Sequence, residues 1–207
     1  MTAKPLPAAG DRPIPPGNRR EQLKAQRRAR LLTAGAGLIA ERGFAGMRLE
    51  DLGAAAGISG PAVYRHFPNK EALLVELLGD ISERLLAHGQ EVIATATAPA
   101  QALAALVDSQ LEFALSRPDL IRMHDRDLHN LPIAQQRQIR TAQRRYVEVW
   151  VTVLRTVAPR LTEAQARVRA HAVFGLLNST PHSTQPQSAE ISRKELRTMA
   201  LAALTAS

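Results

Sequence analysis

The chain has 207 residues, of which 45% are hydrophobic and 22% are charged, and this balance is typical of a globular protein rather than a disordered one. It contains no cysteine, which excludes disulfide bonds, thiolate metal sites and cysteine catalysis. The sequence has neither an apolar run of about 18 residues, as a membrane span requires, nor the pattern of a signal peptide, so we expect a cytoplasmic protein.

Nearly all of the excess positive charge lies in the first third of the chain. Residues 1–70 carry 12 Lys or Arg and 5 Asp or Glu, a net charge of +7, whereas the remaining 137 residues carry 15 and 14, a net charge of +1. This asymmetry has two interpretations. The basic segment is either a solvated tail or a head that binds a polyanion and is attached to a neutral body.

The first 20 residues are basic and rich in proline, with Pro5, Pro7, Pro13, Pro15 and Pro16 among few apolar side chains. Such a segment cannot bury enough surface to offset the entropy that is lost when it becomes ordered. Residues 1–20 are therefore expected to form a disordered arm.

Three helices are predicted next, over residues 21–42, 49–56 and 60–67. Gly43 and Gly57 follow the first two, and glycine adopts the left-handed conformation of a helix C-terminus without strain. Ser59 is the expected N-cap of the third helix, and Pro61 falls in its first turn, where no backbone donor is needed.

Helical periodicity continues through the rest of the chain. Apolar residues recur every four positions within a long helix over about 70–95, at Leu73, Leu77, Ile81 and Leu85. Prolines at positions 99, 118 and 132 then separate helices predicted over about 100–116, 119–129 and 133–157.

Two capping boxes predict the last helices. Thr162 with Gln165 begins a helix over 162–179, and Ser192 with Glu195 begins one over 192–205, where Ile191 would pack on Leu196. The polar segment 182–190 is predicted to be the loop between them. Without any strand pattern, the fold class is all-α, with a three-helix domain over 21–70 and a larger helical domain over 71–207.

The segment from Gly43 to Leu74 has the layout of a helix-turn-helix, in which the second helix enters the DNA major groove. Eight helical residues from Gly60 to Phe67 would rise about 12 Å, which matches the groove width of roughly 12 Å. A small core is expected between two sets of residues, Leu49, Leu52 and Ala56 on one side and Ile58, Val63 and Phe67 on the other. The small side chains of Gly53, Ala54 and Ala55 would let the two helices approach closely.

This segment resembles the TetR family of transcriptional regulators. The resemblance lies in Gly43-Phe44, Leu49-x-Asp51-Leu52, Ala56-Gly57-Ile58-Ser59, Tyr64-Arg65-His66-Phe67 and Asn69-Lys70-Glu71-Ala72-Leu73. The order of the later helices is similar as well, so the resemblance covers residues 21–207. It implies a homodimeric, ligand-responsive regulator, expected to be a repressor, that binds a palindromic operator in double-stranded DNA.

The resemblance also implies which residues contact DNA: Arg48, Ser59, Gly60, Pro61, Ala62, Tyr64, Arg65, His66 and Lys70. Tyr64 offers a hydroxyl to a phosphate and a ring to a thymine methyl group. Arg65 is expected to bind phosphate rather than guanine, and Lys70 to bind phosphate. Alternatively, Tyr64 is a core aromatic residue and His66 an ordinary surface histidine, whereas Phe67 is expected in the core.

Met47 departs from the family pattern, which usually has Thr or Ser at this position to cap the second helix and contact phosphate. Methionine cannot cap a helix, so either the cap moves or the helix start loses about 1 kcal/mol and Arg48 takes over the phosphate. The departure leaves an alternative open, namely an all-α protein that binds a small molecule or a partner without binding DNA.

No catalytic motif or phosphate-binding loop is present, so we expect neither an enzyme nor a cofactor. His124 and His129 in the segment HDRDLH suggest a metal site. Residues five apart on a helix point in different directions, however, and this favours polar roles at a surface or in a pocket.

The helices over 162–179 and 192–205 are expected to form the homodimer interface through Ala170, Val173, Phe174 and Leu177 on one and Leu196, Met199, Ala200 and Ala203 on the other. The alternative is that both helices only complete the core of their own chain.

A pocket for a small effector is predicted from large apolar residues and one polar residue, although each of them is otherwise an ordinary core residue: Phe113, Met123, Leu128, Tyr146, Trp150, Phe174 and Asn178. The segments RDLHNLP and QRRYVEVW are similar to TetR regulators of lipid and sterol catabolism, whose effector is commonly an acyl-coenzyme A thioester. Arg140, Arg144 and Arg145 would then bind its anionic head group, or else form a solvated basic face.

Overall fold

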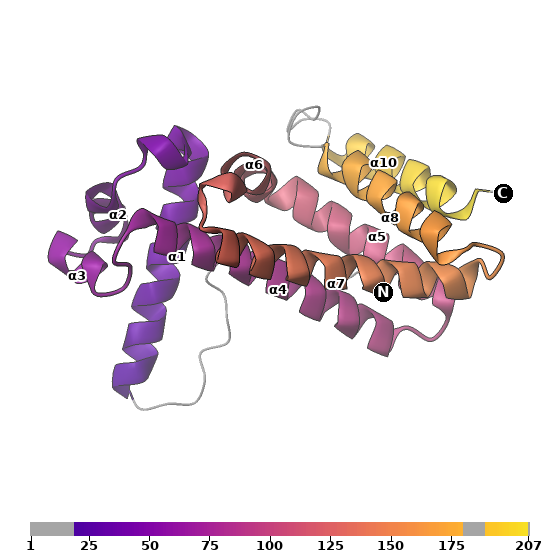
Figure 1. Ribbon diagram of the computed structural model, residues 1–207, viewed down its shortest axis with the longest axis horizontal. Helices are drawn as coiled ribbons and strands as arrows, with labels where there is room; N and C mark the ends of the chain where they lie inside the picture. Colours follow the sequence, from indigo (N-terminus) through magenta and orange to yellow (C-terminus); the bar gives the residue numbers. More distant parts are fainter. Residues whose placement is uncertain (1–18, 180–188, 207) are drawn as a thin grey trace. The chain divides into compact units, whose positions relative to one another are not determined.

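The computed structural model describes residues 19–179 and 189–206, and every regular element in these ranges is a helix (Figure 1). The predicted all-α class is therefore confirmed. The helices are α1 (Arg19–Gly46), α2 (Leu49–Ala56), α3 (Gly60–Tyr64), α4 (Lys70–Thr95), α5 (Pro99–Ser116), α6 (Pro118–Asp127), a short 3-10 helix η1 (Leu128–Asn130), α7 (Ile133–Val157), α8 (Glu163–Asn178) and α10 (Ala189–Thr205).

The described residues form two compact units. The first, here called the head, contains residues 19–81 and 122–139, and the second, here called the body, contains residues 82–121, 140–179 and 189–206. Helices α4, α6 and α7 each contribute residues to both units. The domain boundary predicted after residue 70 divides the chain in a different way and stays a prediction.

Glycine ends the early helices where the sequence predicted it. Gly43 has a φ of 73° and interrupts the helical conformation within α1, whose last turn continues to Gly46. Gly57 has a φ of 64° and a ψ of 36°, the left-handed conformation, and it ends α2. Most of the arm predicted over residues 1–20 lies outside the described residues, but Arg19 and Arg20 already belong to α1.

The core of the head is built from apolar faces of α1, α2 and α4. Leu31 and Ile39 of α1, Leu52 of α2 and Leu73 of α4 are all inaccessible to solvent. Helices α1 and α4 approach closely at Gly35, where a Cβ atom would lie 2.8 Å from Cδ2 of Leu73. This packing holds the two short helices α2 and α3 on a rigid base.

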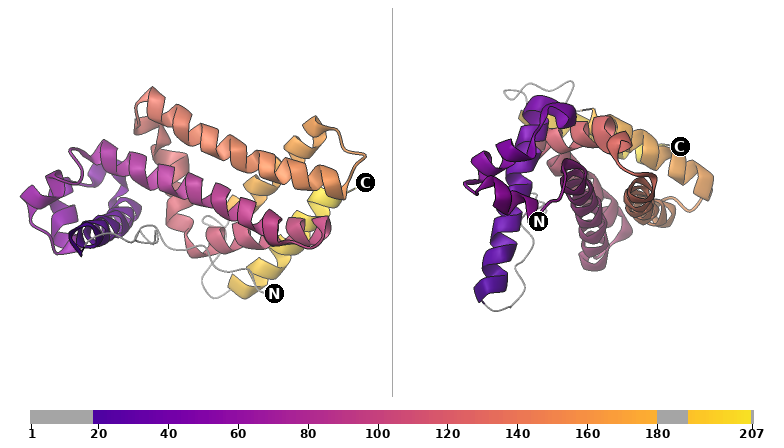
Figure 2. Two further views of the ribbon diagram at one scale, coloured as in Figure 1. Left: turned by 90° about the horizontal axis from the view of Figure 1, so that it is seen from below. Right: turned by 60° about the vertical axis from the view of Figure 1, so that its left-hand side comes forward.

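The body is a bundle in which α5, α7, α8 and α10 share one core (Figure 2). Helix α10 packs against α5 and α8. Two ion pairs join α10 to α5, Arg193 with Glu112 and Arg197 with Asp108, the latter at 2.6 Å between Nε and Oδ1. No helix in the described ranges combines the length and the apolar character needed to cross a membrane.

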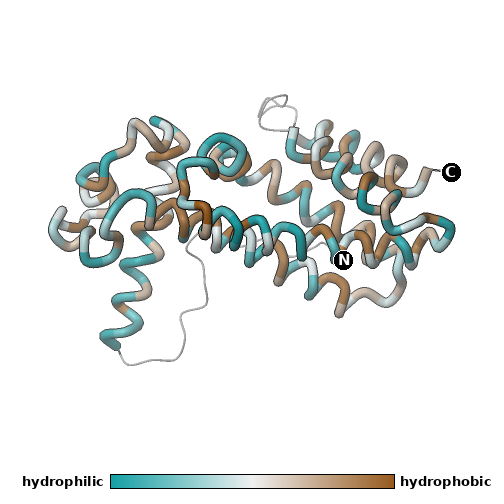
Figure 3. The backbone as a smooth tube through the Cα atoms, viewed as in Figure 1, coloured by the Kyte–Doolittle hydropathy of each residue, from teal (hydrophilic) through white to brown (hydrophobic). Residues whose placement is uncertain are grey.

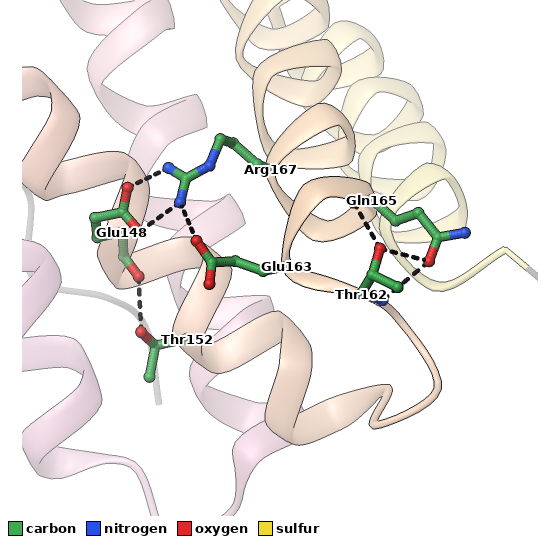
Figure 4. A network of polar contacts seen from close by, with 6 residues as sticks. All are labelled: Glu148, Thr152, Thr162, Glu163, Gln165 and Arg167. Atoms are coloured by element: carbon green, nitrogen blue, oxygen red, sulfur yellow. Dashed lines mark hydrogen bonds and ion pairs between the residues drawn. The ribbon is translucent and has the colours of Figure 1, made fainter.

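The capping box at the start of α8 is confirmed (Figure 4). The Thr162 hydroxyl accepts a hydrogen bond from the Gln165 backbone N–H at 3.3 Å, and the Gln165 side chain accepts one from the Thr162 backbone N–H at 2.9 Å. In the same region Arg167 bridges α7 and α8, with Nη2 lying 3.0 Å from Glu148 Oε2 and 2.7 Å from Glu163 Oε1.

The second predicted capping box is wrong. Helix α10 begins at Ala189, so Ser192 lies inside the helix and cannot serve as its N-cap. Ile191 is 69% exposed and does not act as the predicted hydrophobic staple. Of the predicted loop, residues 182–188 lie outside the described residues, and positions 189 and 190 are helical.

Candidate nucleic-acid interface

Helices α2 and α3 are joined by a tight three-residue turn, Gly57 to Ser59. The Ile58 N–H donates to the Gly53 carbonyl at 2.9 Å, which closes the end of α2. The Ser59 carbonyl accepts from the Ala62 N–H at 2.9 Å, which opens α3. Helix α3 ends at Tyr64, three residues before the predicted end, and turn residues lead from it to the buried Phe67.

One glycine allows the two helices to touch. A Cβ atom on Gly53 would lie 2.8 Å from the Ile58 carbonyl oxygen and 3.2 Å from Cγ2 of Val63. The prediction that Ala54 and Ala55 share this role is wrong, because both are exposed.

The predicted small core is mostly confirmed. Leu49, Leu52, Val63 and Phe67 are buried, whereas Ala56 and Ile58 are half-buried. Phe67 is therefore a core aromatic residue of this segment, as predicted. Tyr64, by contrast, is 47% exposed, which rules out the interpretation of it as a core residue.

The residues predicted to contact DNA lie at or near the surface of the head. Arg48, Ser59, Pro61, Tyr64 and Arg65 are exposed. The remaining four are half-buried: Gly60, Ala62, His66 and Lys70. The first turns of α1, which carry Arg19, Arg20 and Lys24, add a hydrophilic segment to the same unit (Figure 3). The positive charge predicted for a polyanion-binding head is thus carried by solvent-accessible side chains.

Tyr64 has a partner that the sequence analysis did not identify. Its hydroxyl donates a hydrogen bond of 2.7 Å to Oε1 of Glu50, which lies in the first turn of α2. This bond lowers the pKa of Glu50 and raises the pKa of Tyr64. The carboxylate is therefore charged and the phenol neutral at physiological pH.

Met47 is a core residue, with 1% of its surface exposed. The N-cap of α2 is Arg48, whose side chain makes no capping hydrogen bond. The cap has thus been lost rather than moved, and the methionine contributes apolar burial instead. Glu50 and Asp51 in the first turn interact favourably with the positive end of the helix dipole.

Lys70 connects the start of α4 to the end of α1. Its Nζ donates to the carbonyl oxygens of Phe44 at 3.1 Å and Ala45 at 3.3 Å, and lies 4.8 Å from the centroid of the Phe44 ring. Asn69 caps the same helix, because its Oδ1 accepts from the Ala72 N–H at 2.8 Å. Lys70 is thus held against the end of α1.

Arg28 of α1 was not identified from the sequence as a site residue. Its guanidinium group binds the Glu76 carboxylate of α4, with Nε at 2.7 Å from Oε1, and donates from Nη1 to the His66 carbonyl at 3.1 Å. The Cζ atom lies 4.7 Å from the centroid of the Phe67 ring. This one side chain of α1 therefore contacts both α4 and the turn that follows α3.

His66 is half-buried, and its Nδ1 is buried without a hydrogen-bond partner in the described part of the chain. Burial lowers the pKa of His66, and the charges of Arg28, Lys24, Arg65 and Arg27 lower it further. The ring is consequently neutral at pH 7.

The segment around His124 contains an ion pair between Arg126 and Asp127. Across residues 19–179 and 189–206, no group of three His, Cys, Asp or Glu side chains is placed to hold a metal ion. The buried Asp127 carboxylate accepts hydrogen bonds from Arg126 at 2.8 to 3.2 Å, and Arg126 also donates to the Ile39 carbonyl of α1 at 3.2 Å. This pair attaches the end of α6 to α1 within the head.

The predicted pocket residues are divided between the units. Met123 and Leu128 are buried in the head, and the other five belong to the body. In the body, the Phe174 ring lies 4.8 Å from Trp150 and 5.6 Å from Tyr146, measured between centroids. Gln110 connects the polar groups, accepting from the Tyr146 hydroxyl at 3.2 Å and donating to Asn178 at 2.9 Å. Phe113 is buried nearby in sequence on α5, the helix that carries Gln110.

The predicted dimer residues are only partly available to a partner. Ala170, Val173, Leu177 and Ala200 are 0–1% exposed in the core of the body, so their assignment to the interface is wrong. Phe174 and Leu196 are half-buried, while Met199 and Ala203 are exposed. Val168 of α8 is a further exposed apolar residue, at 68%.

The arrangement of α2, its glycine turn and α3 on a basic head defines a helix-turn-helix protein of the DNA-binding class. The family model described as "Bacterial regulatory proteins, tetR family" matches residues 31–77, and that described as "Tetracyclin repressor-like, C-terminal domain" matches residues 96–182. The chain belongs to the TetR family of transcriptional regulators.

Two relatives are named HTH-type transcriptional repressor KstR2. The one from Mycolicibacterium smegmatis is 27% identical over 70% of this chain and 68% of its own length. The one from Rhodococcus jostii is 29% identical over 63% of this chain and 65% of its own length. About two thirds of each relative is thus matched, and both are regulators rather than enzymes.

Solved structures share the fold. A TetR-family regulator from Bordetella parapertussis superimposes with a TM-score of 0.76 at 21% identity, covering 86% of this chain and 94% of that chain. AibR in complex with isovaleryl coenzyme A and operator DNA gives a TM-score of 0.71 at 18% identity, covering 84% and 97%. FadR from Bacillus subtilis in complex with stearoyl-CoA gives 0.69 at 17% identity, covering 86% and 97%.

Proposed function

We propose that this protein is a homodimeric repressor that binds a palindromic operator through α3 of each subunit and releases it when an acyl-CoA-like effector binds the body. The observation that carries the proposal is the exposed edge of α3 and its C-cap residue, where Pro61, Tyr64 and Arg65 face solvent beside a buried Val63. Side chains on this edge can reach base edges and phosphates while the helix stays attached to the head.

The competing hypothesis, a protein without DNA binding, loses its support. It rested on the missing Thr or Ser at Met47, and Met47 fills a core position instead. The change at this position therefore reflects packing and leaves the exposed residues of α3 in place.

Two recognition helices in a dimer would need a separation of about 34–36 Å to enter successive major grooves. The exposed apolar residues of α8 and α10, Val168 and Met199, supply the surface for such a dimer. Val168→Glu with Met199→Glu should convert the protein to a monomer in sedimentation equilibrium. Ile133→Glu is the matched control, since Ile133 is 68% exposed but lies in the head, and its variant should remain dimeric.

The effector class is supported by the body and by the neighbours that bind acyl-CoA thioesters. Tyr146, Trp150 and Phe174 form an apolar aromatic cluster beside the polar groups of Gln110 and Asn178, a combination typical of sites for small apolar ligands. Arg140, Arg144 and Arg145 are exposed. Exposure is required both for contact with an anionic head group and for a solvated basic face.

A binding assay tests both halves of the proposal. The purified dimer is titrated against the DNA upstream of its own gene, with isovaleryl-CoA, stearoyl-CoA or free coenzyme A added. We expect specific binding without thioester, and a loss of about 5- to 150-fold in affinity with one of the two thioesters but not with coenzyme A. Binding that is equal for upstream and random DNA contradicts the operator proposal, and binding unchanged by both thioesters contradicts the effector proposal.

A further inference from the structure

Helix α3 cannot set its own orientation. It has only five residues, its N-cap Ser59 makes no side-chain capping bond, and it ends at Arg65 without a glycine cap. Isolated helices of this length are unstable in water, because the cost of nucleation exceeds the gain from one or two hydrogen bonds. Its direction must therefore be imposed by contacts at its two ends.

At the N-terminal end the contact is the close approach of Gly53 to Ile58 and Val63. At the C-terminal end, the turn that follows α3 is held by Arg28. The His66 carbonyl accepts from Nη1 at 3.1 Å, and the Phe67 ring lies under the guanidinium plane, 4.7 Å from Cζ.

The guanidinium group is itself held by the carboxylate of Glu76. Both carboxylate oxygens accept hydrogen bonds from it, Oε1 from Nε at 2.7 Å and Oε2 from Nη2. The two side chains are 39% and 29% exposed, so solvent partly screens the pair, but bidentate geometry and stacking restrict it to one orientation.

We infer that Arg28, anchored by Glu76, is a positioning residue for DNA recognition that fixes the C-terminal end of α3 against α1 and α4. The inference rests on the proposed operator binding. Arg28 acts through the His66 carbonyl and the Phe67 ring, and its fork is already directed at Glu76. It therefore sets how well α3 matches base edges and is not one of the cations that neutralise phosphate.

Lysine at position 28 keeps the charge but not the planar fork, and so it cannot bind Glu76, the His66 carbonyl and the Phe67 face together. Arg28→Lys therefore separates positioning from charge. Glu76→Gln is a milder second variant, which leaves Arg28 in place and weakens its anchor. Arg42→Lys is the matched control, because Arg42 is another α1 arginine with an acidic partner, Asp51 at 3.0 Å, and this partner belongs to α2 rather than to α3 or the turn that follows it.

The experiment begins with selection of a binding site from a random-sequence duplex library by the wild-type dimer. Affinities for the selected site and for a random duplex are then measured across a salt series, at a temperature where circular dichroism shows each variant to be folded. We expect Arg28→Lys to lose about tenfold or more in affinity for the selected site, with affinity and salt dependence on the random duplex unchanged. Glu76→Gln should change affinity in the same direction, and the double variant should be no worse than Arg28→Lys alone.

Three results would overturn the inference. Arg28→Lys could bind the selected site as tightly as the wild type. A drop in affinity shared by both duplexes, with a salt slope reduced by about 2 per dimer, would make Arg28 a phosphate ligand. An equal loss of site affinity in Arg42→Lys would make the effect general to ion pairs of α1. If the wild type enriches no sequence, the proposed function itself fails. If the wild type enriches a site and Arg28→Lys binds that site equally well, only the inference about Arg28 fails.

Discussion

The Tyr64 hydroxyl and the Glu50 carboxylate are joined by a hydrogen bond of 2.7 Å that links α3 to α2 at the surface. The bond restricts the orientation of the Tyr64 ring before any DNA is present. It also places a negative charge next to a residue that is proposed to approach phosphates. We expect such a charge to weaken binding to arbitrary DNA, and so to contribute specificity through repulsion as well as attraction.

Removal of the Tyr64 side chain should abolish specific binding without unfolding the protein. Because the residue is 47% exposed, Tyr64→Ala removes little core surface, and we expect the dimer and its circular dichroism spectrum to be preserved. Specific affinity should fall to the level of random DNA in fluorescence anisotropy. Tyr64→Phe should have an intermediate effect, and wild-type affinity in Tyr64→Ala would exclude the residue from the interface.

Neutralisation of Glu50 should act in the opposite direction on arbitrary sequences. Glu50→Gln removes the repulsion from phosphates, so its affinity for a random duplex should rise while the ratio of specific to non-specific affinity falls. The measurement is a competition titration at several salt concentrations. An unchanged ratio would mean that Glu50 stays away from the DNA backbone in the complex.

Because Gly53 lies so close to the turn, a single methyl group added at this position should lower the free energy of unfolding. In Gly53→Ala the new Cβ would meet the Ile58 carbonyl at 2.8 Å, and that backbone atom belongs to the turn itself. We expect a loss of about 1–3 kcal/mol in the free energy of unfolding, measured by urea denaturation. Gly79→Ala is the control, since nothing lies within 4 Å of its Cβ position in α4, and it should gain about 0.5–1 kcal/mol.

Features that depend on neighbouring residues were predictable from the sequence, and those that depend on distant residues were not. Gly43, Gly57 and the Thr162 capping box follow local rules, and each appears at the predicted position. Arg28 and Glu76 are 48 positions apart, and no spacing rule connects them.

Periodicity also failed to distinguish a chain's own core from its interface with a partner. Ala170, Val173 and Ala200 have the helical spacing of a buried stripe, and the structure buries them inside the body. The residues left outside, Val168 and Met199, lie on other faces of the same helices. A pattern of apolar residues indicates which face is buried, but not by which molecule.

Burial of Met47 predicts that restoring the common family residue would weaken the fold. Met47→Thr regains no N-cap, because Arg48 is the N-cap residue and position 47 precedes it, and the change leaves a cavity where the methionine side chain was, at a cost of about 2–5 kcal/mol for complete truncation. Because threonine keeps part of the side-chain volume, we expect a loss of about 1–3 kcal/mol in the free energy of unfolding. Met47→Leu should stay within about 1.5 kcal/mol of the wild type, and greater stability in Met47→Thr would mean that burial of Met47 does not stabilise the fold.

His66 should make the stability of the head depend on pH. Burial, together with the charges of Arg28, Lys24, Arg65 and Arg27, lowers its pKa in the folded state below the ordinary value of 6.5. Between these two pKa values the unfolded chain binds more protons than the folded one, so folding stability is complete above about pH 6.5 and falls as the pH drops toward the folded-state pKa. His66→Gln keeps the size of the side chain and removes the titration. In thermal melts between about pH 7.5 and 5.5, the wild type should therefore lose more stability than His66→Gln, since other titrating groups are common to both proteins. Parallel melting curves would show that the ring takes up a proton equally well in the folded and unfolded states, and that the basic side chains around it do not keep it neutral.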